Sequence, residues 1–220
     1  PFAYLTAFEK GLLPETVLFD VPTEFAANHP LCPPIPDFKN ENKACFHPEN
    51  FDSIFRGPVS LRTALSQSIN IPAVKILYIA GLRETVEIAR RFGLRTLANP
   101  DLYGLSLVLG GGAIRLLDLV GAYGVLAADG IHHDQAMVLE VRDGTGKILD
   151  AYRDSSERVS GSQSIRLIND ILTDTNARRG LFEGSLSLTM FENHDVALKT
   201  GTSNDYRDAW AFGYTPSLVV

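Results

Sequence analysis

The sequence predicts an α+β protein with a mainly antiparallel sheet. Two observations carry this prediction: amphipathic helical patterns fill the middle of the chain, and strand-like alternating runs close it. A turn signal at 143–146, Asp-Gly-Thr-Gly, adds a hairpin between them. Helices followed by strands, rather than alternating with them, are typical of the α+β class.

Composition narrows the class of protein. The chain has 220 residues and 45% hydrophobic content, enough for a substantial core in one domain or in one domain with an excursion. The net charge is −6 and no basic stripe with interleaved aromatics occurs, so we expect no nucleic-acid partner. No apolar run approaches the roughly 18 residues that span a bilayer, so any membrane anchor would lie outside these residues.

The first third of the chain reads as one helix and one long loop. Apolar residues at helical spacing predict a helix over 2–12, ended by Gly11 and Pro14. Repeated prolines make 17–55 a long loop, which we expect to border a functional site, although a surface insertion is an alternative. Cys32 and Cys45 lie in it and are either a disulfide or two thiols. The nearby histidines match no usual zinc-ligand spacing, and we expect no metal.

The segment 60–130 reads as mainly helical. Ser60 is a plausible N-cap for a helix to Ser66, and Pro72 permits a new helix over 73–79 closed by Gly81. Ser68 and Asn70 then fall at a helix junction, where both can point into a cleft. Further helices are expected at 82–92 and 116–128. The glycines at 110–112 lack the spacing of a phosphate loop and predict a tight turn.

The segment 137–220 is expected to hold the hairpin, one helix and the closing strands. Strands at 137–142 and 148–152 flank the turn, and a helix follows at 162–173. Strands at 196–199 and 209–214 are joined by 201–208, and a last strand starts at Leu218.

The tetrad Lys199-Thr200-Gly201-Thr202 carries the strongest chemical signal. Lys199 ends an apolar run, so its ammonium would sit at the edge of a cleft, where it can attract a carboxylate or help to move a proton; an ordinary exposed lysine is the alternative. Gly201 leaves room for a substrate backbone along the strand. Thr200 and Thr202 would project hydroxyls from one face, although such a sequence also ends ordinary strands.

Ser68-Ile69-Asn70 has the S-x-N pattern, which taken alone is most often a capping pair. Together, S-x-N followed by K-T-G is typical of serine β-lactamases and penicillin-binding proteins. The flanking residues agree over nearly the whole chain. They are Pro48 to Asp52, Arg56 to Arg62, Ala64 to Val74, Leu107 to Gly111, Ala122-Tyr123, Ala127 to Gly130, Lys199 to Ser203 and Asp208 to Tyr214.

These residues resemble the transpeptidase domain of class A, bifunctional penicillin-binding proteins. The resemblance implies the transpeptidase fold shared with serine β-lactamases, here incomplete at both termini. It also implies a peptidoglycan D,D-transpeptidase that forms a serine acyl-enzyme on D-alanyl-D-alanine stem peptides and is acylated by β-lactams, with no cofactor. The location implied is extracytoplasmic, with an anchor and a fused N-terminal glycosyltransferase domain elsewhere in the polypeptide.

The same resemblance assigns roles to the site residues. Ser68 would relay a proton to the leaving amine, and Asn70 would bond the substrate amide and hold the catalytic lysine. Lys199 would support the relay and bind the substrate carboxylate. Thr200 and Thr202 would contact that carboxylate, and the N–H of Thr202 would form half of the oxyanion hole.

One part of the family pattern is missing. No lysine here has Ser or Thr three residues before it, so the nucleophilic S-x-x-K is absent from these residues. In the family, Pro-Phe commonly follows that motif, and this chain begins Pro1-Phe2. We therefore expect a polypeptide cut directly after the catalytic lysine, and a segment that is inactive alone.

Two other functions stay open. A β-lactam sensor or a non-catalytic scaffold with the same fold is one, and the residues ahead of Pro1 would decide it. A serine β-lactamase is the other. Nothing here resembles its deacylating glutamate region, and the long proline-rich loop favours the class A proteins.

Overall fold

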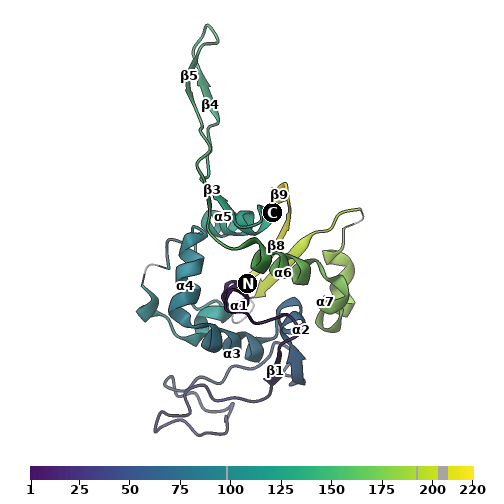
Figure 1. The fold of residues 1–220 in the computed structure, drawn as a ribbon. Coiled ribbons are helices and arrows are strands. Elements are labelled where there is room, and N and C mark those ends of the chain that lie inside the picture. Colours follow the sequence, from purple (N-terminus) through teal and green to yellow (C-terminus); the bar gives the residue numbers. More distant parts are fainter. Residues whose placement is uncertain (98, 192, 203–207) are drawn as a thin grey trace.

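A central helix organises the molecule. The computed structural model describes residues 1–97, 99–191, 193–202 and 208–220. Helix α1 (Phe2–Glu9) is buried from Ala3 to Phe8, and helices from later in the chain pack around it (Figure 1). A helix that is apolar on all sides is expected to be buried on all sides. Within that run, Thr6 donates its hydroxyl to the Phe2 carbonyl at 2.8 Å.

Three helices follow the proline-rich segment: α2 (Leu61–Ser66), α3 (Asn70–Ala80) and α4 (Leu82–Arg91). Helices α3 and α4 pack beside α1, and α2 packs against α3. The predicted cap of α2 is confirmed, since the Ser60 side chain accepts from the Thr63 N–H. The predicted start of the next helix at Ala73 is wrong. Helix α3 begins at Asn70 because Pro72 falls in its first turn, where a missing N–H costs nothing.

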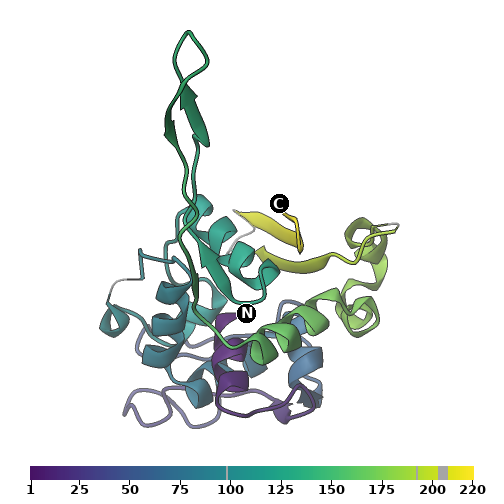
Figure 2. The same ribbon diagram turned by 45° about the horizontal axis from the view of Figure 1, so that its top comes forward.

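The closing sheet is antiparallel, with strand order β7-β8-β9: β7 (Ala197–Thr202), β8 (Ala209–Thr215) and β9 (Leu218–Val219). Helices α5 (Leu116–Ala127) and α6 (Ser162–Thr173) pack against it (Figure 2). Tyr123 of α5 stacks on Phe212 with ring centroids 5.0 Å apart, and the Tyr214 hydroxyl donates to the Asn169 side-chain oxygen at 2.8 Å. Strand β7 runs to Thr202, beyond the expected end at Lys199.

The expected loop 17–55 starts as a strand. Strand β1 (Val17–Asp20) pairs antiparallel with β2 (Gly57–Ser60), since the first proline of the segment comes only at Pro22. Residues 21–56 contain no further helix or strand, and within them Cys32 and Cys45 form a disulfide.

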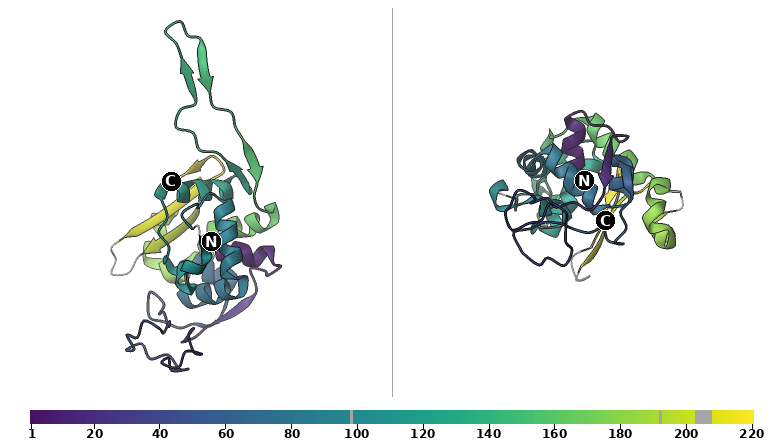
Figure 3. Two further views of the ribbon diagram at one scale, coloured as in Figure 1. Left: turned by 90° about the vertical axis from the view of Figure 1, so that its left-hand side faces the viewer. Right: turned by 90° about the horizontal axis from the view of Figure 1, so that it is seen from below.

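A long hairpin projects from the body at the end opposite to this loop (Figure 3). At its base, β3 (Ile131–His133) pairs with β6 (Ser156–Arg158), which the sequence did not reveal. At its tip, β4 (Glu140–Arg142) pairs with β5 (Ile148–Ala151), which confirms the predicted hairpin with shorter strands.

The remaining elements are short. Helix α7 (Thr175–Phe182) was not anticipated; the Asp174 side chain caps it by accepting from the Ala177 N–H at 2.8 Å. Among the described residues there are also three 3-10 helices: η1 (Pro100–Leu102), η2 (Leu105–Leu109) and η3 (Glu183–Thr189). Gly110 after η2 is left-handed, with φ 100°, as the predicted tight turn requires. Within the described ranges, every helix is too short or too polar to cross a bilayer.

Candidate functional site

The S-x-N and K-T-G residues meet between the helices and the sheet. The Lys199 ammonium donates to the Ser68 hydroxyl oxygen at 2.6 Å, across 131 positions of sequence. It also donates to the Thr200 carbonyl at 2.7 Å. A cationic amine in contact with a hydroxyl is an arrangement that can exchange a proton. The two motifs that the sequence analysis combined are therefore in direct contact.

Ser68 adopts an unusual backbone conformation at the junction of α2 and α3. Its φ is 58°, in the left-handed region that residues other than glycine rarely adopt. Hydrogen bonds on both sides hold it there: the Ser68 N–H donates to the Leu65 carbonyl at 3.2 Å, and the Ile69 N–H donates to the Ala64 carbonyl at 3.0 Å. Conformations of this kind persist where surrounding structure fixes them, and they gather at functional sites.

Asn70 is the first residue of α3, close to Ser68 in the chain. Its side-chain amide donates to the Glu49 carbonyl at 2.7 Å, and its backbone N–H donates to the Asn50 side-chain oxygen at 3.0 Å. Asn70 is thus held by the end of the proline-rich segment. Its expected contact with a catalytic lysine involves a residue outside this sequence and stays a prediction.

Strand β7 presents the other predicted residues along one edge of the sheet. Within the described residues, β7 pairs only with β8, so its second edge is free to take another strand. A Cβ placed on Gly201 would meet no heavy atom within 4 Å, so this glycine borders open space. Thr200 and Thr202 alternate with it on the opposite face. Ser203, the last member of the matched motif, lies outside the described residues, as do 204–207.

The surroundings of Lys199 lower its pKa. Burial, and then the positive charge of Arg178, lower the pKa of Lys199 from 10.5 to about 8. At neutral pH the ammonium therefore gives up its proton far more readily than that of a free lysine. A lysine that has a lowered pKa and contacts a hydroxyl is typical of sites that move protons.

Arg178 is a residue that the sequence analysis missed. It lies on α7 with only 2% of its surface exposed, and donates to the carbonyls of Leu172 and, at 3.3 Å, Thr189. Burial lowers its own pKa, and Asp174 opposes this shift. Beside it, the Gln67 side chain donates to the Ala177 carbonyl at 2.8 Å, which ties α7 to the residue before Ser68. The only available signal was a pair of arginines in a segment with no clear helical period.

The start of α1 lies beside the same lysine. The backbone nitrogen of Pro1 lies within electrostatic range of the Lys199 ammonium. Helix α1 therefore begins near Lys199.

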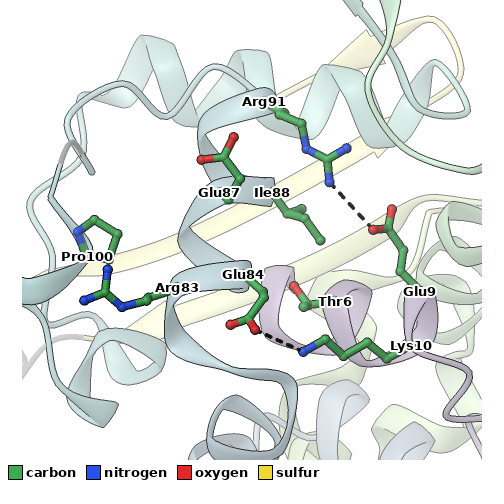
Figure 4. A pocket seen from close by; sticks show the side chains of 9 residues that line it. All are labelled: Thr6, Glu9, Lys10, Arg83, Glu84, Glu87, Ile88, Arg91 and Pro100. Atoms are coloured by element: carbon green, nitrogen blue, oxygen red, sulfur yellow. Dashed lines mark ion pairs between the residues drawn. The ribbon is translucent and has the colours of Figure 1, made fainter.

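A cavity away from both motifs has different chemistry. It measures about 700 Å³ and lies between α1 and α4 (Figure 4). Its charged residues are largely paired: Lys10 lies 3.5 Å from Glu84, and Arg91 lies 3.7 Å from Glu9. None of its lining residues belongs to either motif. Across the part of the chain that the structure describes, no three His, Cys, Asp or Glu side chains gather as metal ligands.

The sequence is similar to those of curated penicillin-binding proteins. Penicillin-binding protein 1A of Neisseria meningitidis is 30% identical over 224 residues, which cover 100% of this chain and 26% of the relative. Penicillin-binding protein 1A of Rickettsia bellii is 28% identical, again over 100% of this chain and 28% of the relative. The chain is homologous to penicillin-binding proteins. No family model matches it.

Solved structures of penicillin-binding proteins share the fold. The crystal structure of penicillin-binding protein 1A from Haemophilus influenzae matches with a TM-score of 0.77 and 25% identity, over 97% of this chain and 35% of that one. An imipenem acyl-enzyme of penicillin-binding protein A from M. tuberculosis matches with a TM-score of 0.75 at 18% identity, over 98% of this chain and 50% of that one. The chain spans only about a quarter of the length of the curated penicillin-binding proteins it matches, 26% and 28%.

Proposed function

We propose that this chain is the larger part of a peptidoglycan D,D-transpeptidase domain, in which Ser68 and Lys199 move the protons of acyl transfer. The contact of 2.6 Å between the Lys199 ammonium and the Ser68 hydroxyl carries the proposal. Homology over the whole chain to penicillin-binding proteins supports the reaction class. The parent protein would act outside the cytoplasmic membrane, anchored by a segment and fused to a glycosyltransferase domain that lie elsewhere in the polypeptide.

The reaction begins with a serine hydroxyl of an S-x-x-K motif that attacks the carbonyl between the two D-alanines. The serine ester forms, the peptide bond breaks, and the proton lost by the serine passes to the leaving D-alanine amine. Ser68 is the group proposed to deliver that proton, and Lys199 then returns a proton to the Ser68 oxygen. The amine of a second stem peptide then attacks the ester, which frees the serine and completes the cross-link.

The nucleophile itself is proposed to reach the site from residues directly ahead of Pro1. The position of the α1 start near Lys199 supports this, because a helix continued upstream would place its preceding turn on the same side of the molecule as that lysine. The 220 residues alone are then expected to form no acyl-enzyme.

Substrate binding is assigned to the edge of β7. A peptide laid along this edge would pair with its main chain, with Gly201 leaving room for the backbone of the substrate. The hydroxyls of Thr200 and Thr202 would bind the terminal carboxylate, and the N–H of Thr202 would help to stabilise the oxyanion. Asn70 would bond the substrate amide.

The test is covalent labelling of the full-length natural polypeptide by a fluorescent penicillin, followed by intact-mass measurement. We expect one adduct per chain, and a loss of about 100-fold or more in labelling rate for Ser68→Ala and for Lys199→Ala. Matched controls are Ser217→Ala and Lys147→Ala, which change exposed residues far from the site in sequence.

Other outcomes would overturn the proposal. Steady release of hydrolysed penicillin would indicate a β-lactamase. Labelling without cross-linking of stem peptides would indicate a sensor or scaffold. Labelling of the 220-residue segment alone would contradict the assignment of the nucleophile.

A further inference from the structure

The N-terminus of α3 lacks a cap of its own. The residue at the cap position, Ile69, has no side-chain acceptor, and the following N–H groups would be left without partners. A side chain from a distant part of the sequence accepts hydrogen bonds from the first two of these N–H groups. The Asn50 side-chain oxygen accepts from the N–H of Asn70 at 3.0 Å and from the N–H of Ile71 at 3.3 Å. Asn50 therefore caps the helix that begins inside the S-x-N motif.

Asn50 is in turn fixed by a buried carboxylate. Its side-chain nitrogen donates to both oxygens of Asp20, at 2.8 and 2.9 Å, and to the Ile54 carbonyl at 2.8 Å. Asn50 is 4% exposed and Asp20 is fully buried, so water does not replace these contacts. Asp20 also accepts from the Arg56 N–H at 2.9 Å. From one short side chain, the carboxamide of Asn50 offers an acceptor to the helix and two N–H donors to Asp20 and the Ile54 carbonyl, whereas a hydroxyl would offer only one donor.

Two more hydrogen bonds join α3 to the residues beside Asn50 and Asp20. The side chain of Asn70 donates to the carbonyl of Glu49, the residue before Asn50. The ammonium of Lys75, farther along α3, donates to the carbonyl of Phe19, the residue before Asp20, at 2.6 Å. Helix α3 is thus tied at both its first and second turns to the segment that carries Asp20 and Asn50.

We propose that Asn50 is a positioning residue for Ser68 and Asn70, and that Asp20 orients Asn50 for this task. The inference rests on the proposed function, because it concerns the site at which acyl transfer would occur. Its physical content is that Ser68 reaches the Lys199 ammonium only while the start of α3 is held by the Asn50 side chain. Neither residue touches the substrate.

The test uses an exchange of side chains in the full-length natural polypeptide. Asn50→Asp keeps the size and the acceptor but removes the donor and sets two carboxylates against each other. We expect its rate of acylation by a fluorescent penicillin to fall about tenfold or more. Combining Asn50→Asp with Asp20→Asn restores a donor facing an acceptor, and we expect this double variant to recover part of the lost rate.

The matched control is Asn99→Asp, at an exposed asparagine that caps η1 through the Asp101 N–H at 3.0 Å. We expect its acylation rate to stay within about twofold of wild type. All rates are measured at a temperature at which thermal melts show every variant folded. A merely structural role would lower the melting temperature and leave the rate of the folded protein unchanged.

Hydrogen exchange separates this inference from the proposed function. In Asn50→Asp we expect faster exchange of the Asn70 and Ile71 amides, with no such change in Asn99→Asp. Unchanged exchange at those amides, or wild-type acylation by Asn50→Asp, would overturn the positioning role. A wild-type protein that no penicillin acylates would overturn the proposed function instead, and the exchange of the two amides would still decide whether Asn50 holds α3.

Discussion

Lys199 is placed where its charge is unfavourable and its proton is useful. The folded protein releases this proton near pH 8, whereas the unfolded chain keeps it until near 10.5. Burial thus penalises the charged lysine most below pH 8, and the penalty fades as pH rises through this window. A lysine with the same pKa in the folded and the unfolded protein would give no such change of stability with pH.

We predict that Lys199→Met raises stability at pH 7 while abolishing acylation. Removing the buried charge should add roughly 2 kcal/mol, less whatever the two lost hydrogen bonds contributed. The gain over wild type should shrink between pH 8 and 10, because wild type then loses the charge by itself. Thermal melts across this pH range provide the measurement. Lys147→Met, on the exposed hairpin, is the control, and a Lys199→Met variant less stable than wild type at pH 7 would refute the account.

At the scale of elements, the proline-rich segment 21–56 depends on a covalent link. Cys32 and Cys45 are 13 positions apart, and a disulfide that closes a loop of this length restricts the unfolded chain. Glu24 also links two parts of this segment. Its carboxylate accepts from the Ala26 and Phe46 N–H groups at 2.8 Å and pairs with His47 at 2.7 Å. These contacts fix a segment that has no helix or strand of its own.

We predict that Cys32→Ser combined with Cys45→Ser lowers the free energy of unfolding by about 2 to 3 kcal/mol. Urea denaturation of the oxidised proteins measures the difference. Reductant should bring wild type down to the level of the variant and leave the variant unchanged. Equal denaturation midpoints with and without reductant in wild type would show that the link adds no stability.

Some of the helices and strands could be predicted from the sequence and others could not. Helix α6 and the cap at Ser60 follow from local periodicity and a hydroxyl in the right place, and both were predictable. Strand β1 was not, because its partner β2 lies beyond the whole proline-rich segment and short strands have little pattern of their own. Helix α7 is short, contains Gly180 and carries no clear apolar stripe, so its pattern was too weak to detect.

The candidate site divides in the same way. Ser68 and Lys199 were predicted from motifs, and their contact followed once both were placed. Arg178, Asp20 and Asn50 act through hydrogen bonds and charge between distant segments. No local spacing reports such contacts, because they depend on which loops the fold brings together.

At the scale of the whole molecule, the projecting hairpin stands apart from the core. Met137, Leu139 and Leu149 are all well exposed, and the chain between 137 and 152 packs against itself. A two-stranded ribbon of this kind adds little to the stability of the body that carries it.

We predict that replacing residues 138–151 by Asn-Gly leaves the melting temperature within about 2 °C of wild type. The acylation rate should also stay within about twofold, since Ser68 and Lys199 lie in the body. Thermal melts and penicillin labelling provide both numbers. A large loss of acylation with an unchanged melting temperature would assign the hairpin a part in the reaction.

The left-handed backbone of Ser68 has a consequence for how this protein can evolve. Glycine would occupy that position with less conformational cost, by about 1 kcal/mol, and would leave the hydrogen bonds of the junction intact. In lineages released from selection for the reaction, a change to glycine would therefore relieve the backbone strain and remove the hydroxyl to which Lys199 donates. Retention of serine at 68 among relatives would mark the copies still under selection for the reaction.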